Sequence, residues 1–338
     1  MVMRVGVVGL GLIGGSLALR LAHSASNVHV VAWNHHDNPY TKAKAQGIEC
    51  VDSLEELVHS DLDVLFLCNP LKVMPHILHD ISEYGLPEKT TLSDVGSVKG
   101  LVSQQVKEAG LYDQFVGAHP MAGNELSGFV AADASIYDNA LWAVCVDEHT
   151  QLHRFMDVIT VITQAVDNTC IVLNDEVHDK AAALISHMPH VVATAFINEI
   201  VDDPNRNIAA LLAAGSWRDM TRVALTDPDR TRAMVEEDAQ NVAQLLRSIS
   251  KRLLAVADNL EEKDMTSLVE FFEQGNPFRL YKSGAVQNLV QQREFVADSE
   301  HWQQDLLDSA KKGERIISIS LQNDDQIHAQ AIQYGGIK

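Results

Sequence analysis

An apolar run near the N-terminus breaks into a cluster of glycines and then into a helical pattern. The run covers residues 5–8, and Gly9, Gly11 and Gly14 follow it with the spacing G-x-G-x-x-G. A second apolar run, residues 28–33, lies where the second strand of a dinucleotide-binding unit is expected. The first glycine permits a tight turn, the second lets a pyrophosphate approach the backbone, and the third lets helix and strand pack closely. The pattern therefore predicts a strand, a phosphate-binding loop and a helix whose N-terminus faces the phosphates.

Three segments are expected to form the cofactor site: the glycine loop, the end of the second strand and the turn after a later strand. Its expected members are Gly9, Gly11, Leu12, Ile13, Gly14, Asn34, His35, Asn69 and Pro70. The alternative for this N-terminus is a secretory signal peptide, because Arg4 precedes an apolar stretch. Five glycines between Gly6 and Gly15 make a poor apolar helix, however, and no small-residue cleavage site stands out. The sequence therefore favours dinucleotide binding.

The large negative net charge of the chain limits the kinds of partner that it can bind. The 338 residues carry a formal net charge of −20, and 46% of them are hydrophobic. Nucleic acids and anionic membranes need basic patches, so neither is an expected partner, whereas a local arginine cluster can still bind an anionic small molecule. No apolar run approaches the length of a membrane span.

The cysteines are widely spaced and form no C-x-x-C motif. They are Cys50, Cys68, Cys145 and Cys170. This spacing predicts buried thiols in a reducing compartment, the cytoplasm, and argues against a disulfide framework or a structural metal site.

Strand-like and helix-like segments alternate through the first half of the chain. After the opening unit, Ser53 begins a capping box for a short helix, and further helices are expected over residues 73–84 and 99–109. The further expected strands are residues 63–68, 90–94, 115–118 and 141–146. This alternation predicts an α/β fold, in which residues 1–172 form a Rossmann-type dinucleotide-binding domain with a parallel, doubly wound sheet.

After the first domain the periodicity becomes helical and strand signals vanish. Apolar residues recur at helical spacing over residues 181–200, 207–214 and 229–274. Helices this long bury an apolar stripe against a partner. Residues 173–285 are therefore expected to form an all-helical substrate and dimerisation domain, and the protein a homodimer. Residues 286–338 are expected to be a polar C-terminal extension with one strand-like piece, residues 315–321.

Two segments at strand ends carry candidate catalytic groups. Residues 94–100, DVGSVKG, follow an expected strand, and ligands bind at the carboxyl edge of such a sheet. Ser97 in this segment is either a site residue or the cap of the next helix. His119 follows the strand at 115–118 and precedes a proline-glycine loop. A histidine held there can take a proton at neutral pH, or it can simply bond a loop carbonyl.

The helical domain contains an H-x-x-H pair in the stretch SHMPH. His187 and His190 could bind a metal from one helix face, but no third ligand lies nearby and Pro189 disturbs the helix. No metal is therefore expected, and the two histidines are interpreted as polar groups that line a pocket.

A pair of arginines further along the helical domain is a candidate anion clamp. Arg218 and Arg222 are four residues apart and so face the same way on a helix. Asp219 lies three residues before Arg222 and could hold its guanidinium. In so acidic a chain this arrangement predicts a clamp for a carboxylate or phosphate. The alternative is an exposed ion pair of little consequence.

Five motifs together resemble the prephenate and arogenate dehydrogenase family of tyrosine biosynthesis. They are GLGLIGGSLA, DVGSVK, GAHPMAGNELSG, SHMPH and WRDMTRVALTDP, and they occur in the family's order. The resemblance implies oxidative decarboxylation of a cyclohexadienol. Hydride leaves the ring carbon that bears the hydroxyl and goes to a nicotinamide, the ring carboxylate departs as carbon dioxide, and the ring becomes aromatic. The implied product is 4-hydroxyphenylpyruvate from prephenate or tyrosine from arogenate.

The resemblance also implies a role for each candidate residue. His119 takes the proton of the ring hydroxyl, Ser97 contacts the same hydroxyl and orients the histidine, and Arg222 grips a substrate carboxylate. The residues that match lining or supporting positions of the pocket are His187, His190, Glu125 and Asp219. Prephenate and arogenate differ in a keto or an amino group, and the choice between them stays open here.

One position departs from the pattern of NAD enzymes. Such enzymes usually carry Asp or Glu about twenty residues after the glycine loop, whereas here Asn34 follows the second strand and two histidines follow Asn34. A neutral residue removes the charge that would repel a 2′-phosphate, so NADP, or the use of both cofactors, is favoured. Two alternative functions are a β-hydroxyacid or imine reductase, with Lys180 as its lysine, and a non-catalytic dinucleotide sensor.

Overall fold

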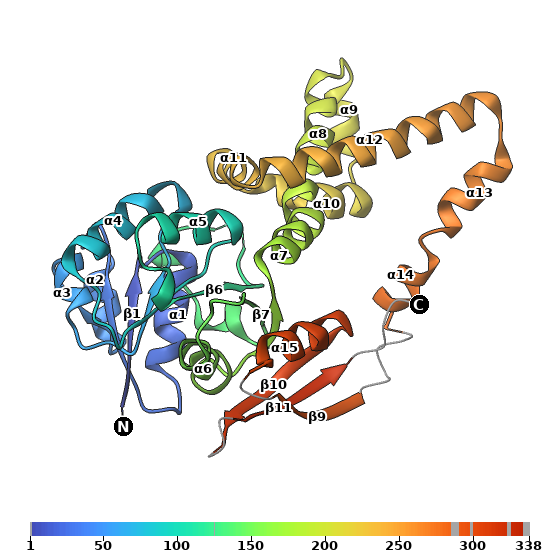
Figure 1. The fold of residues 1–338 in the computed structure, drawn as a ribbon. Coiled ribbons are helices and arrows are strands. Elements are labelled where there is room, and N and C mark those ends of the chain that lie inside the picture. Colours follow the sequence, from blue (N-terminus) through green and yellow to red (C-terminus); the bar gives the residue numbers. More distant parts are fainter. Residues whose placement is uncertain (1, 125, 285–290, 298–299, 323–325, 334–338) are drawn as a thin grey trace. The chain divides into compact units, whose positions relative to one another are not determined.

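The computed structural model describes residues 2–124, 126–284, 291–297, 300–322 and 326–333. The chain divides into two compact units (Figure 1). The first comprises Met1–His178 and Ser283–Lys338, and the second comprises Asp179–Lys282. The sequence placed the corresponding boundaries after residues 172 and 285. Each unit is described below by itself.

The first unit is built on one sheet, and its described strands have the order β3-β2-β1-β4-β5-β6-β7-β8-β10-β11-β9. The strands before the helical unit are β1 Met3–Val8, β2 Val28–Trp33, β3 Glu49–Cys50, β4 Val64–Leu67, β5 Thr91–Asp94, β6 Phe115–Pro120, β7 Leu141–Cys145 and β8 Thr169–Leu173. From β3 to β6 all pairings are parallel, and β1 lies between β2 and β4. This order reverses the direction of winding beside β1, which is where ligands bind in such sheets.

The expectation of a wholly parallel sheet is wrong at β7. This strand pairs antiparallel with β6, with His119 opposite Ala143, and β8 then runs parallel to β7. The reason is the connection, since the described residues between β6 and β7 form two short 3₁₀ turns, Phe129–Ala131 and Ala134–Tyr137, and no crossover helix. The strand β8 was itself missing from the sequence-based list.

Helices cover both faces of the sheet and enclose two apolar cores. They are α1 Leu12–Ala22, α2 Tyr40–Ala45, α3 Leu54–Val58, α4 Met74–Tyr84, α5 Gly100–Glu108 and α6 Leu152–Thr160. Side chains of α1, α2 and α6 belong to one core, and those of α3, α4 and α5 to the other. The capping box is confirmed, because the Ser53 hydroxyl accepts a hydrogen bond from the Glu56 amide at 3.0 Å.

The last segment of the chain returns to the first unit and extends its sheet (Figure 1). It forms β9 Gln291–Ala297, α15 Trp302–Lys311, β10 Glu314–Leu321 and β11 Ile327–Gln333. Ile316 of β10 pairs with Cys170 of β8, and Trp302 packs against Phe155 of α6 with ring centroids 4.7 Å apart. The expected strand at 315–321 is present, but the expected polar extension is a folded part of the first unit.

The second unit, Asp179–Lys282, is helical and contains no strand. Its helices are the end of α7 (Asp175–Ala182), a π-helical turn Ala183–His187, α8 Met188–Asp202, α9 Arg206–Leu212, α10 Gly215–Thr221, the 3₁₀ turn Arg222–Leu225, α11 Pro228–Glu237, α12 Ala239–Glu262, α13 Met265–Glu273 and α14 Asn276–Lys282. The long pattern expected from residue 229 to 274 is thus divided into three helices. One break falls at Lys263, which has a left-handed backbone with φ +58°.

The run from Asp175 to Asp202 is the one described helix that is long and apolar enough to cross a membrane, with a mean hydropathy of 1.2 over its most apolar window. The sequence had suggested no such segment. The match rests on length and composition alone. Core helices of globular domains meet the same criterion.

Candidate active site

The glycine loop joins β1 to α1 and has the geometry that its three glycines require. Gly9 has a positive φ of +96°. A Cβ atom on Gly14 would lie 2.1 Å from the carbonyl oxygen of Gly9 and 2.6 Å from the Cβ atom of Cys68, so only glycine fits there. A Cβ atom on Gly11 would meet nothing within 4 Å. The loop is therefore closed at Gly9 and Gly14 and open at Gly11, where a pyrophosphate is expected.

The first turn of α1 presents backbone amides to this open side. The helix begins at Leu12, and Gly11 is its N-cap without any side-chain cap. The first helical hydrogen bond runs from the Gly15 amide to the Gly11 carbonyl at 2.9 Å. The amides of Leu12, Ile13 and Gly14 thus have no acceptor within the helix, and no acidic side chain occupies the first turn. Since the Leu12 side chain is buried, its contribution to a phosphate site is its amide.

Asn34, at the end of β2, is part of the loop's own hydrogen-bond network. Its Oδ1 accepts a hydrogen bond from the Leu10 amide at 2.8 Å, and its Nδ2 donates to the His36 carbonyl at 2.8 Å. The Asn34 amide nitrogen also donates to the Tyr40 hydroxyl at 3.0 Å. The next residue, His35, lies with its ring 4.6 Å from that of His36. The side chain expected to face the ribose therefore also holds the glycine loop in place.

Asn69 supplies an independent sign that the edge of the sheet takes a ligand. It follows β4, whose Leu67 pairs with Val8 of β1. Its Nδ2 lies 3.2 Å from the Pro70 carbonyl, whereas its Oδ1 is buried and has no hydrogen-bond partner among the described residues. A buried acceptor without a donor is costly. The residues at this edge fit a dinucleotide, which carries hydroxyl and amide donors as well as phosphates.

His119 lies at the carboxyl end of β6 and is half-buried. Its Nδ1 is 2.9 Å from Nε2 of His178, a residue of α7 that is 2% exposed. The ring centroids are 5.1 Å apart and the rings are inclined by 70°. The partner of Nδ1 is therefore a second histidine. The sequence analysis missed His178, which belongs to none of the motifs.

A buried ion pair holds the backbone just before His119. Lys99 and Asp94 are 1% and 0% exposed, and the Lys99 ammonium donates both to the Asp94 carboxylate and to the Ala118 carbonyl, the latter at 2.7 Å. Burial raises the pKa of the Asp94 carboxyl, while the Lys99 ammonium and the Gly96 and Ala118 amides oppose that rise. Asp94 and Lys99 both belong to the DVGSVK motif, but their pairing was not foreseen.

Ser97 lies in the loop between β5 and α5 and is half-buried. It does not cap α5, since the N-cap is Lys99 without a side-chain hydrogen bond. The Ser97 hydroxyl makes no hydrogen bond to another described residue. Because Ser93 pairs with Val116, the loop after β5 and the end of β6 are neighbours at one edge of the sheet. Glu125, the other residue expected near this edge, lies outside the described residues.

The remaining predicted residues belong to the helical unit. His187 is fully buried, and its Nδ1 lies 2.8 Å from the Asp238 carboxylate, so it supports the packing of α12. His190 is half-buried, with its Nδ1 2.9 Å from the Ser186 carbonyl. No metal-binding cluster of His, Cys, Asp or Glu occurs among the described residues.

Arg222 is exposed and begins the 3₁₀ turn after α10. The expected ion pair between Arg222 and Asp219 is wrong for the described residues, because none is formed there. The helix α10 ends at Thr221, so Arg222 lies just beyond it and not within the same α-helix as Asp219.

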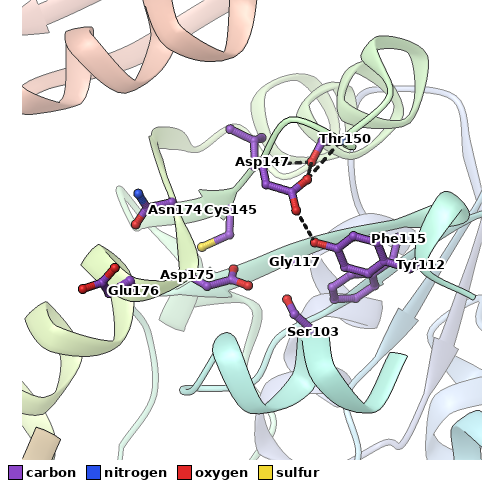
Figure 2. Close-up of a pocket in the computed structure, with 11 residues that line it drawn as sticks. Ser103, Tyr112, Phe115, Gly117, Cys145, Asp147, Thr150, Asn174, Asp175 and Glu176 are labelled. Carbon is purple, nitrogen blue, oxygen red and sulfur yellow. Dashed lines mark hydrogen bonds between the residues drawn. The ribbon is translucent and has the colours of Figure 1, made fainter. Parts of the chain in front are cut away.

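The first unit contains a cavity of about 260 Å³, and none of the predicted site residues lines it. Figure 2 shows the residues that line this cavity. The Asp147 carboxylate in this cavity accepts hydrogen bonds from the Tyr112 hydroxyl at 2.6 Å and from the Thr150 hydroxyl at 3.1 Å. Burial and this carboxylate raise the pKa of Tyr112. The Asp147 carboxylate is thus hydrogen-bonded within the cavity wall.

Comparison with known proteins identifies the family. Residues 17–169 match the nucleotide-binding domain of prephenate dehydrogenase, and residues 174–274 match its dimerization domain. A prephenate dehydrogenase of Lactococcus lactis subsp. cremoris is 27% identical over 278 residues, which are 81% of this chain and 75% of that protein.

Two solved structures extend this comparison. Prephenate dehydrogenase from A. aeolicus in complex with hydroxyphenyl propionate and NAD⁺ is 26% identical with a TM-score of 0.76, over 83% of this chain and 98% of that one. Synechocystis arogenate dehydrogenase is 25% identical with a TM-score of 0.71, over 82% and 99%. The glycine loop, the histidine at the end of β6 and the helical unit thus belong to a member of the prephenate dehydrogenase family of NAD-dependent oxidoreductases.

Proposed function

We propose that this protein catalyses the oxidative decarboxylation of prephenate or arogenate in tyrosine biosynthesis, with a nicotinamide dinucleotide as the hydride acceptor. The observation that carries the proposal is the setting of His119. It lies at the ligand-binding edge of a sheet with a dinucleotide loop, and its Nδ1 is engaged by His178. Proton transfer with a substrate is therefore left to Nε2.

The reaction needs little covalent chemistry from the protein. The nicotinamide, when bound, accepts the hydride from the ring carbon that bears the hydroxyl. His119 accepts the hydroxyl proton as the hydride leaves. The bond from the ring to its carboxylate breaks to release carbon dioxide, the electrons of that bond complete the aromatic ring, and the ring oxygen takes back a proton to give the phenol. Since aromatisation supplies the driving force, the side chains mainly orient the ring and move one proton.

The other predicted residues orient the substrate in this proposal. Ser97 contacts the ring hydroxyl, and the exposed Arg222 binds a substrate carboxylate. His190 lines the pocket, and Asp219 and Glu125 complete its polar surface. His187 supports the pocket from within the helical unit through its contact with Asp238.

For the cofactor, the proposal is that NADP is accepted at least as well as NAD. No carboxylate occupies residues 34–36, which follow β2, so nothing at these positions repels a 2′-phosphate. The polar atoms of Asn34 already hold the loop, and the rings of His35 and His36 follow directly and can donate to a phosphate.

We place the enzyme in the cytoplasm as a homodimer, with no nucleic acid or membrane partner. The four cysteines are free thiols, in keeping with a reducing compartment. The match of residues 174–274 to a dimerization domain supports the second copy.

The test is a spectrophotometric assay of both substrates against both nicotinamide cofactors. The expected result is reduction of the cofactor with release of carbon dioxide for at least one substrate, and kcat/KM for NADP no lower than for NAD. No turnover with either cyclohexadienyl compound would contradict the assignment and favour the reductase or the non-catalytic sensor.

A further inference from the structure

His178 has a specific place in the first unit although no motif includes it. It lies on α7, is 2% exposed, and directs its Nε2 to Nδ1 of His119 at 2.9 Å. That distance is within the range of a hydrogen bond between ring nitrogens. The two rings are inclined by 70°, so the contact is an edge-on hydrogen bond rather than the stacking of two apolar faces.

The chemistry of two neutral imidazoles allows only two states of this contact. Each neutral ring carries one proton, and one of the two facing nitrogens must donate. If His119 Nδ1 donates, its Nε2 is a bare acceptor that can take a proton from a substrate. If His178 Nε2 donates, the proton of His119 is on Nε2, and the ring cannot act as a base there.

We propose that His178 is a positioning residue that holds His119 in its reactive tautomer by accepting the hydrogen bond from Nδ1–H. The inference rests on the proposed function, in which His119 is the proton acceptor. After proton transfer the imidazolium still donates Nδ1–H to His178. The contact therefore persists through the reaction, and no group has to reorganise.

The backbone at His119 and its ring are held by different residues. The backbone before His119 is held separately, since Lys99 donates to the Ala118 carbonyl and the Ala118 amide points to the Asp94 carboxylate at 3.4 Å. Neither contact restrains rotation of the His119 ring about its side-chain bonds. On α7 itself, Asp175 and Glu176 lie in the first turn, before His178.

Substitutions of His178 separate positioning from mere packing. His178→Ala is expected to lower kcat roughly 10- to 100-fold, as losing the partner that orients an active-site histidine does, with KM for the substrate within about twofold. His178→Gln is expected to recover a large part of kcat, because its amide oxygen can accept from Nδ1–H. Val177→Ala, on the same helix and 50% exposed in the wild type, is the matched control and should leave kcat unchanged.

Nitrogen-15 NMR of histidine-labelled protein decides the tautomer without any turnover. The His119 signals are assigned by their loss in His119→Asn. Wild-type protein is expected to show His119 with a protonated Nδ1 and a bare Nε2, and His178→Ala is expected to lose that preference. A wild-type His119 protonated at Nε2, or a kcat of His178→Ala equal to that of Val177→Ala, would overturn the proposal. Absence of turnover in the wild type would instead contradict the proposed function, and the spectrum would still decide the tautomer.

Discussion

His119 is the residue on which the proposed chemistry depends most directly. Replacement by Asn keeps a polar side chain of similar shape but removes the base. We expect His119→Asn to lower kcat roughly 10²- to 10⁴-fold, the usual contribution of general base catalysis, while the binding of substrate stays within a few-fold. Steady-state kinetics measure both, and His149→Asn, at an exposed histidine with a 66% exposed side chain, is the control. An unchanged kcat would remove His119 from the mechanism.

Arg222 should act on binding rather than on the chemical step. The residue is exposed and has no ion-pair partner among the described residues, so its guanidinium is available to a carboxylate. A charge-assisted contact contributes about 1.5–3 kcal/mol, which corresponds to a rise in substrate KM of roughly tenfold to a hundredfold for Arg222→Ala. Arg232→Ala, at another exposed arginine, should leave KM unchanged. A change confined to the KM for the cofactor would contradict the assignment.

Asn34 is the residue that should set the preference between the two cofactors. A carboxylate at this position would still accept the hydrogen bond from the Leu10 amide, but it would repel a 2′-phosphate. We expect Asn34→Asp to shift the preference toward NAD, mainly by raising the KM for NADP. The ratio of kcat/KM for the two cofactors measures the shift. A wild-type ratio already far in favour of NAD would show that Asn34 is simply a neutral ligand of the ribose.

At the scale of the element, the turn from β1 into α1 contains one glycine with a structural role and another with a role in binding. Gly14→Ala places a Cβ atom 2.1 Å from a backbone oxygen, so we expect a loss of stability of about 1–3 kcal/mol together with weaker cofactor binding. In Gly11→Ala the added Cβ atom has no neighbour within 4 Å. This variant should keep the stability of the wild type but bind the cofactor more weakly. Thermal unfolding and cofactor titration of both variants check this. Equal stability of the two variants would contradict the packing argument.

Some elements were predictable from sequence and others were not, for reasons of burial. The strands β1, β2 and β4 are buried on both faces and appear as continuous apolar runs bounded by glycine, proline or polar residues. In β11, by contrast, only alternate residues such as Ile327 and Ala329 are buried, so polar partners between them conceal the strand. The direction of β7 could not be predicted because an apolar run carries no sign of its orientation.

The candidate site divides in the same way. The glycine loop, Ser97 and His119 lie in short motifs whose spacing already indicates their chemistry. The partner of His119 is 59 residues away in sequence, and the contact arises only when the start of α7 and the end of β6 come together in the fold. The bonds of Lys99 to Asp94 and to Ala118 likewise depend on two neighbouring strands. The sequence motifs therefore identify His119, whereas the residues that hold it are seen only in the tertiary structure.

At the scale of the whole molecule, the helical unit exposes more apolar surface than an isolated unit of its size would keep. Exposed side chains there include Leu184, Ile185, Ile208, Leu211, Leu212, Leu253, Leu254, Val269, Phe272 and Phe278. Many exposed apolar side chains in one unit favour an interface, and residues 174–274 match a dimerization domain. We expect light scattering to give twice the chain mass of 37.2 kDa at working concentration. A mass of one chain would contradict the dimer.

The first unit is discontinuous in sequence, and this has a consequence for how the protein is made. A ribosome releases β8 and the whole helical unit before it releases Trp302, which covers Phe155, and β10, which pairs with β8. During synthesis the nascent sheet therefore carries an open edge and an uncovered core while the following unit is already complete. Removal of the segment from Trp302 to β10 would uncover Phe155 and the edge of β8, so the fold of the N-terminal half depends on a segment made after the helical unit.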